Sequence, residues 1–132
     1  MERARSDAGF FYFRVVYIVI SIIFEISKCK RYDVAMDTKQ ALSALASLAQ
    51  EHRLAVFRLL VQTGPEGLAA SKIGEQLALA PSSLSFHLKE LSHAGLITAR
   101  QQGRFLIYTA DISAMNGLIG FLTQNCCGGN PC

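Results

Sequence analysis

The residues best suited to chemistry lie at the very end of this chain, where three of its four cysteines fall within the last seven residues. Cys126 and Cys127 are adjacent, and a disulfide between neighbours is strained because their Cα atoms are too close together. Gly128 and Gly129 allow the backbone to fold back and bring Cys132 towards the pair. Three thiolates without a nearby histidine or carboxylate suit a thiophilic centre with three ligands, whereas zinc generally takes four. Trivalent arsenic or antimony fits this set of donors.

Two other uses of the same thiols stay open. The cysteines could be oxidised rather than ligated, which would make the protein a redox sensor. They could also serve a thiol enzyme or a metal-carrying protein, but the sequence shows no acid–base partner or oxyanion site beside them. We therefore expect a binding protein rather than an enzyme, with no required cofactor.

The residues that precede the cysteines show helical periodicity. Apolar residues recur at spacings of three and four after Asp37, which can cap a first helix. A second helix is expected to end at Gly64-Pro65, and Ser71 is expected to cap a short third one. Pro81 suits the first position of a fourth helix, which continues to about Ala94. The pattern predicts one mainly α domain.

The predicted helix from Pro81 to Ala94 has two unlike faces. Leu84, Leu88 and Leu91 make a narrow apolar stripe that can pack against a core. The residues that could contact DNA bases lie in the first half of the helix, away from this stripe: Ser82, Ser83, Ser85, Phe86 and His87. Hydroxyl and amide groups donate to phosphates or base edges, and an aromatic ring can touch a thymine methyl group. Two short helices of this kind predict a helix-turn-helix.

A β-hairpin is expected after this helix. Two extended runs, Leu96–Arg100 and Arg104–Thr109, flank Gln101-Gln102-Gly103. Arg100 and Arg104 stand where a wing would meet the phosphate backbone of DNA. Three apolar side chains are expected to pack inward: Ile97, Phe105 and Ile107. A reading helix followed by a basic wing is much stronger support for DNA binding than either feature alone.

The last predicted helix has more apolar residues than one stripe requires. Asp111 can cap it, and its apolar residues are Ile112, Met115, Leu118, Ile119, Phe121 and Leu122. Because fewer than 100 residues follow Met36, the core of one subunit is thin. Pairing this helix and the first one with their symmetry mates in a homodimer would bury the excess.

Taken together, these segments resemble the ArsR/SmtB family of winged-helix repressors. The resemblance is carried by Ala41-Leu42-Ser43-Ala44-Leu45, His52-Arg53-Leu54, Leu84-Ser85-Phe86-His87-Leu88-Lys89-Glu90-Leu91, Ala94-Gly95-Leu96-Ile97, and Gly103-Arg104 leading to Tyr108. It runs from about Met36 to Cys132. It implies a mainly α winged helix-turn-helix with a small hairpin wing, a homodimer through the first and last core helices, and double-stranded operator DNA as partner.

The resemblance also bears on the sensing site. Some family members sense arsenite with cysteines on a helix of the helix-turn-helix, but Ala69 and Ser71 stand at those positions here. Others build a zinc site on the last helix; Asp111 matches one of its ligands, but different residues stand at the others: Ser113, Gln124 and Cys127. A third type has arsenite-sensing cysteines at the end of the last helix, matched here by Cys126, Cys127 and Cys132.

Residues 1–35 differ in composition from the rest of the chain. Phe10–Ile26 is rich in aromatic and β-branched residues, interrupted only by Arg14, Ser21 and Glu25, yet its stretch without charges, Val15–Phe24, spans only ten residues where a transmembrane helix needs about 20. No small-x-small cleavage pattern of a signal peptide follows. The break at Met36 favours that residue as the real start, with a membrane-associated helix as the alternative. Cys29 counts as a fourth ligand only if this leader is made.

The sequence thus predicts a leader at 1–35, a DNA-binding and dimerisation domain at 36–123, and a metalloid-binding tail at 124–132. We expect a cytoplasmic homodimeric repressor that holds its operator until As(III) or Sb(III) binds the three cysteines. A membrane is expected as a partner only if residues 1–35 are expressed. Two further histidines, His52 and His93, are expected at the surface rather than as ligands.

Overall fold

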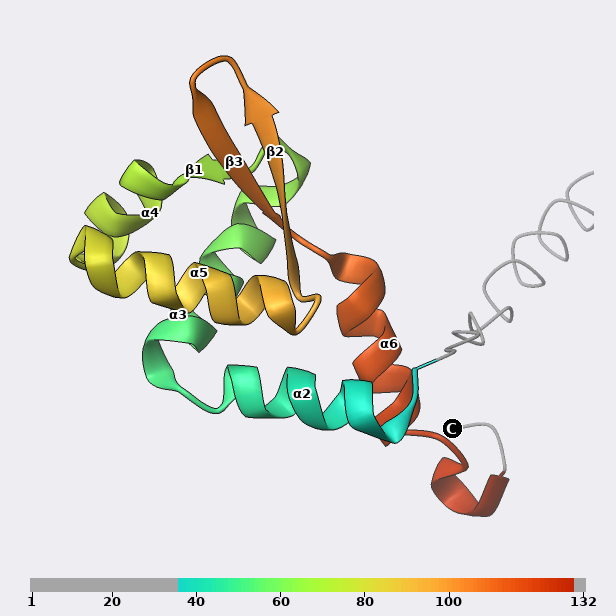
Figure 1. The fold of residues 1–132 in the computed structure, drawn as a ribbon. Coiled ribbons are helices and arrows are strands. Elements are labelled where there is room, and N and C mark those ends of the chain that lie inside the picture. Colours follow the sequence, from blue (N-terminus) through green and yellow to red (C-terminus); the bar gives the residue numbers. More distant parts are fainter. Residues whose placement is uncertain (1–35, 130–132) are drawn as a thin grey trace, which may run out of the picture. The chain divides into compact units, whose positions relative to one another are not determined.

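The computed structural model describes residues 36–129, all within the unit Tyr32–Cys132. The expectations about residues 1–35, Cys29 and Cys132 therefore lie outside the described residues. The elements follow in the order α2 (Thr38–Leu48), α3 (Glu51–Thr63), the 3-10 turn η1 (Gly64–Glu66), β1 (Leu68–Ala69), α4 (Ala70–Leu77), α5 (Pro81–His93), β2 (Ile97–Gln102), β3 (Phe105–Ala110), α6 (Ile112–Leu122) and the 3-10 turn η2 (Cys126–Gly129) (Figure 1). The expectation of a winged helix-turn-helix is confirmed.

Local side chains fix where the first and last helices begin. The Asp37 carboxylate accepts a hydrogen bond from the Gln40 amide at 2.7 Å, and the Gln40 side chain accepts one from the Asp37 amide at 3.0 Å. This reciprocal pair is a capping box, which satisfies two amide groups that the helix itself leaves open. Asp111 caps α6 in the expected way, because its carboxylate accepts from the Ala114 amide at 3.0 Å.

The cap of α4 differs from the expectation. Ala69 occupies the N-cap position and has no side chain that could accept a hydrogen bond. Ser71 lies one residue inside the helix and is exposed, so the prediction that it caps α4 is wrong. The short strand β1 is the reason: its pairing with β3 holds Leu68 and Ala69 extended, and the helix begins directly after them.

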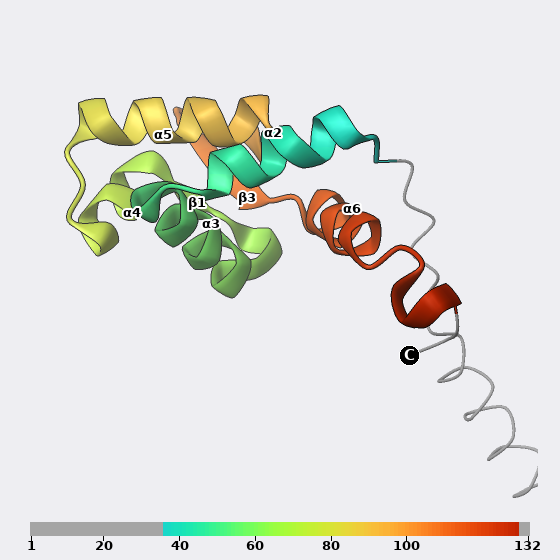
Figure 2. The same ribbon diagram turned by 90° about the horizontal axis from the view of Figure 1, so that it is seen from below.

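The core lies where α3, α4 and α5 meet the sheet. Leu60, Ile73, Leu91 and Leu96 are fully buried there, and Leu84 and Leu88 complete the expected apolar stripe of α5. Seen from below, α5 and α2 run along one side of the domain, with α3 and α4 beneath them (Figure 2). The two helices of the helix-turn-helix, α4 and α5, are thus held from behind by α3.

The hairpin is longer than the sequence suggests. Strand β2 continues through Gln102, which pairs with Phe105, so only Gly103 and Arg104 form the turn. Gly103 has a φ of 62°, a conformation that glycine adopts without strain. Strand β1, which the sequence analysis did not predict, pairs with β3 to make a three-stranded antiparallel sheet in the order β1-β3-β2.

The hairpin's apolar residues do not all pack inward. Ile97 is buried and Ile107 is half-buried, but Phe105 keeps 62% of its surface exposed, so the expectation for Phe105 is wrong. The cause is the length of the hairpin. Its base lies on the core, whereas its tip projects from the body of the domain, beyond the reach of the described helices (Figure 1).

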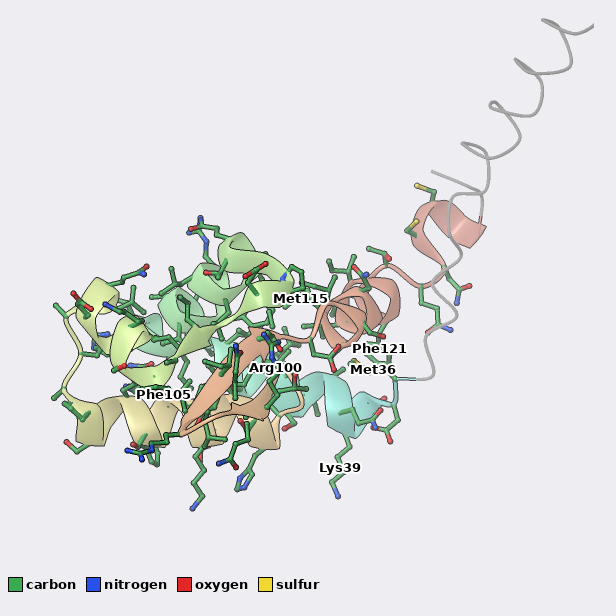
Figure 3. The ribbon with its side chains drawn as sticks, turned by 90° about the horizontal axis from the view of Figure 1, so that it is seen from above. Met36, Lys39, Arg100, Phe105, Met115 and Phe121 are labelled. Carbon is green, nitrogen blue, oxygen red and sulfur yellow. The ribbon has the colours of Figure 1, made fainter. Side chains whose placement is uncertain are left out.

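Helices α2 and α6 lie together and leave apolar surface uncovered. Figure 3 shows Met36, Met115 and Phe121 in this region, where all three are partly buried against the core. Other apolar side chains of the two helices remain exposed: Leu42, Leu45, Ile112, Ile119 and Leu122. Within residues 36–129, every helix is too short or too polar to cross a membrane.

Candidate functional site: the reading helix, the wing and the cysteine turn

The start of α5 presents polar groups to the outside. Ser82, Ser83, Ser85 and Phe86 are all exposed, as the sequence predicts, while the leucine stripe of the same helix is buried. The N-cap is Ala80, which offers no side-chain acceptor to the first-turn amides, and the first turn contains no acidic residue. Helix N-termini carry a partial positive charge and open N–H groups. This end of α5 is therefore suited to phosphate oxygens and to acceptors on base edges.

His87 is the member of this candidate set that the structure places elsewhere. It is only 9% exposed, because position 87 lies beside Leu84, Leu88 and Leu91 on the buried side of the helix. Its ring lies 5.5 Å from that of His52 on α3, centroid to centroid. The side chain of His87 packs between α5 and α3, so its contact with the operator stays a prediction that this geometry does not favour.

The environment of His87 disfavours the protonated ring. Burial, followed by the positive fields of His52 and Arg53, lowers the pKa of His87 below its ordinary value of 6.5. Its Nδ1 atom is buried and finds no hydrogen-bond partner within the described residues. A proton there would add a buried charge next to a guanidinium. The sequence carried a signal for this placement, since His87 lies three residues from Leu84. His52 and His93 are exposed, as expected.

The two wing arginines have different surroundings. Arg100 donates from Nη1 to the Pro65 carbonyl at 3.0 Å and from Nη2 to the Glu66 carbonyl at 2.6 Å. Its guanidinium thus joins β2 to the turn η1, and Arg100 is labelled beside the sheet in Figure 3. Arg104 lies in the exposed turn at the tip of the hairpin. Contact of either residue with DNA stays a prediction, but the geometry favours Arg104.

The contact of η1 with the wing is a feature that sequence reasoning missed. Gly67 has a φ of 72°, and a Cβ atom placed there would lie 2.5 Å from the Tyr108 carbonyl oxygen and 2.6 Å from a methyl group of Thr109. Only glycine therefore permits this approach to β3. Arg100 and Gly67 together attach the hairpin to the body of the domain.

The cysteine turn follows α6 closely. The Cys126 amide donates to the Thr123 carbonyl at 3.0 Å, and the Thr123 hydroxyl donates to the Ile119 carbonyl at 2.8 Å. Cys126 and Cys127 are exposed. Positive φ angles at Asn125 and Cys127, 58° and 54°, turn the backbone sharply. Between residues 36 and 129 there is no group of three side chains able to share a metal ion, and Cys132 lies outside that range.

Comparison with known proteins agrees with this geometry. A family described as "Helix-turn-helix domain" matches residues 48–100. An uncharacterised HTH-type transcriptional regulator, YceK of Bacillus subtilis (strain 168), is 36% identical over 58 residues, which are 44% of this chain and 57% of that protein. This chain therefore spans little more than half of the length of that relative.

Solved structures extend the likeness from sequence to fold. An ArsR-like transcriptional regulator from Rhodococcus sp. RHA1 aligns with a TM-score of 0.59 at 24% identity, covering 65% of this chain and 78% of that one. A possible transcriptional regulator for arsenical resistance aligns with a TM-score of 0.53 at 27% identity, covering 61% and 80%. These relatives are described as regulators, in agreement with the expectation that the chain is not an enzyme. Residues 48–100 thus match a helix-turn-helix domain, and the described residues share the winged helix-turn-helix fold of ArsR-like transcriptional regulators.

Proposed function

We propose that this protein is a homodimeric transcriptional repressor that binds operator DNA and leaves it when As(III) or Sb(III) binds Cys126, Cys127 and Cys132. One observation carries the DNA-binding part. The N-terminal half of α5 exposes Ser82, Ser83 and Ser85 together with Phe86, while its leucine stripe anchors the helix in the core. A rigid helix with an open, polar N-terminus is what the major groove accepts.

The homodimer is supported by the exposed surface of α2 and α6. Leu42 is 61% exposed, Ile119 48% and Leu122 58%, although all three are large aliphatic residues. These side chains belong to two helices that touch each other. A second copy of the same surface would bury them through a two-fold axis. Operators of such dimers have two matching half-sites.

The inducer is supported by the chemistry and the position of the tail. Thiolates are soft ligands, and two of the three proposed donors are exposed on a turn hydrogen-bonded to the end of α6. Binding at this turn would constrain the same helix that supplies the proposed dimer surface. The similar protein described as a possible regulator for arsenical resistance points to the same class of inducer.

The size of the effect can be bounded. Effectors typically supply about 1 to 3 kcal/mol of coupling, which corresponds to roughly 5- to 150-fold weaker DNA binding. Two inducer sites in one dimer would add to this value. A near-complete switch therefore requires both sites to be filled.

A gel-shift titration of the full chain tests this proposal. The probe is a duplex selected by the protein from a random-sequence pool, and the complex is titrated separately with arsenite, cadmium and zinc. Release by arsenite at lower concentration than by zinc supports a three-thiolate site. Failure to select any sequence, or release by zinc alone, would contradict the proposal.

Redox sensing is the second candidate, and the exposure of Cys126 and Cys127 favours it as well. Mass measurement after treatment with arsenite or with peroxide separates the two. An arsenic adduct that accompanies DNA release supports ligation, whereas oxygen adducts that accompany release without arsenite support oxidation.

A further inference from the structure

We propose that Phe105, at the tip of the wing, is an apolar wedge that enters the minor groove of operator DNA, partly unstacks a base step and bends the duplex. The inference rests on the DNA-binding part of the proposed function and adds a specific role for one side chain. It concerns a residue that the sequence analysis placed in the core and that the structure places outside it.

The exposure of Phe105 is the first observation. Phe105 keeps 62% of its surface in water, and its neighbour Leu106 keeps 50%. Leaving a phenylalanine this exposed forgoes much of the hydrophobic stabilisation that burial would provide. Because side chains alternate along a strand, Phe105 and Leu106 point to opposite faces of the hairpin. Leu106 therefore supplies a matched apolar control on the other face.

Rigidity is the second observation. Arg100 pairs with Ile107 in the sheet, two positions from Phe105, and its guanidinium is fixed on the carbonyl groups of Pro65 and Glu66. Nearer the base, the hydroxyl groups of Thr98 and Thr109 lie 3.0 Å apart across the two strands. A wedge must not yield when it is pushed against stacked bases. The wing is held on the body of the domain up to a point close to Phe105.

The charge of the wing indicates what the tip contacts. Residues 97–110 contain two arginines, Arg100 and Arg104, and no acidic residue. Arg104 directly precedes Phe105, so a cation and an apolar ring stand side by side at the tip. Nucleic acid combines an anionic backbone with an apolar interior between base pairs. Proteins that bend DNA through the minor groove insert phenylalanine or aliphatic side chains in this way.

The proposed dimer surface leaves the tip available. Helix α6 begins two residues after Ala110, at the base of the hairpin, whereas Phe105 lies at its far end. A subunit packed on α2 and α6 would thus contact the end of the domain near the hairpin base. The apolar tip needs a different partner, and the bound duplex is the one that charge favours.

The test measures DNA bending by the full chain on a duplex selected from a random pool. The selected site is placed at different positions in otherwise identical fragments, and electrophoretic mobility reports the bend; 2-aminopurine at each step of the site reports unstacking. We expect the wild-type protein to bend the DNA and to raise fluorescence at one step per half-site. Phe105→Ala should lose both signals and bind about tenfold more weakly, with an unchanged salt dependence. Leu106→Ala should keep both.

Three results would overturn the proposal in distinguishable ways. If Phe105→Ala bends DNA as the wild type does, the wedge is wrong while the proposed function stands. If Phe105→Ala changes the oligomeric mass of the free protein, Phe105 is a subunit contact instead. If the wild-type chain selects no duplex at all, the proposed function fails and the wedge fails with it. Because Phe105 is exposed, its replacement by alanine should leave the thermal unfolding of the protein unchanged, which serves as the folding control.

Discussion

Residues close together in α5 lie on opposite faces of the helix, one exposed and one buried. The exposed serines face outward and His87 faces the core, although Ser85 and His87 are only two positions apart in the sequence. In a helix of 3.6 residues per turn, two positions are a rotation of about 200°, which takes a side chain to the other face. Predictions about contact with DNA and about pH therefore apply to different residues of the same helix.

Ser85→Ala should weaken binding to the selected operator about 2- to 12-fold, because one hydrogen bond to a base edge is removed. The fold should be unaffected, since Ser85 is exposed. Ser92→Ala is the matched control: it changes an exposed serine at the other end of α5. Fluorescence anisotropy with operator and random duplexes measures both variants. An equal loss of affinity on random DNA would show that Ser85 touches only phosphate.

His87 should make the protein less stable in acid. Burial lowers its pKa in the folded state below the unfolded value of 6.5. As the pH falls through 6.5, the unfolded chain takes up a proton that the folded protein resists, so stability falls by up to about 1.4 kcal/mol per pH unit until the lower, folded pKa is reached. Above this range the ring contributes no pH dependence. His87→Leu should flatten the acid limb in urea unfolding measured between pH 5 and 8, and an unchanged limb would contradict the assignment.

Helices and strands can be predicted from the sequence where their hydrophobic pattern spans many residues, and they are missed where it spans only two. The predicted ends of α5 agree with the observed ones to within a residue, because the leucine stripe, Pro81 at the start and Gly95 after the end all indicate the same helix. Strand β1 has two residues and no pattern to recognise. Phe105 was assigned to the core because alternation along a strand shows which residues share a face but not where the covering helices end.

In the wing, the sequence alone does not show which of two arginines is available to contact DNA. Arg100 and Arg104 both flank the expected turn, and residue type alone could not separate a structural arginine from one available to DNA. The separation depends on the carbonyl groups of Pro65 and Glu66, more than thirty residues earlier in the chain. The cysteines lie close together in the sequence, so their proximity can be predicted without the fold, whereas the choice between ligation and oxidation stays a prediction.

The two wing arginines should give opposite results when each is replaced by alanine. Arg104→Ala should lower the slope of log affinity against log salt by about one for each phosphate that the arginine neutralises, with little change in stability. Arg100→Ala should leave that slope unchanged and destabilise the fold by about 1 kcal/mol, because it removes two exposed hydrogen bonds to η1. Salt titrations of operator binding, with urea unfolding in parallel, separate the two. An unchanged salt slope for Arg104→Ala would show that Arg104, at the tip of the wing, contacts no phosphate of the DNA.

In the whole molecule, operator binding requires a dimer that joins two copies of the α4–α5 helix-turn-helix. Ile119→Glu places a charge in the exposed apolar surface of α6 and should shift the protein from dimer to monomer in sedimentation measurements. Operator binding should fall with it, because a monomer can occupy only one half-site. Val61→Glu is the control, since Val61 is a similarly exposed aliphatic residue on α3. A dimer that survives Ile119→Glu would place the interface elsewhere.

Arsenite binding at the three cysteines is proposed to release the protein from DNA, and a comparison of cysteine variants tests this step. Arsenite is titrated into operator complexes of the wild type and of a triple variant, Cys126→Ser, Cys127→Ser and Cys132→Ser, with Cys29→Ser as the matched control. All three proteins should bind the operator with equal affinity without arsenite, because the reading helix and wing are unchanged. The wild type and Cys29→Ser should be released as two arsenic atoms bind per dimer, and the triple variant should not be released. If the triple variant dissociates at the wild-type arsenite concentration, the sensing site lies elsewhere and the proposed mechanism is wrong.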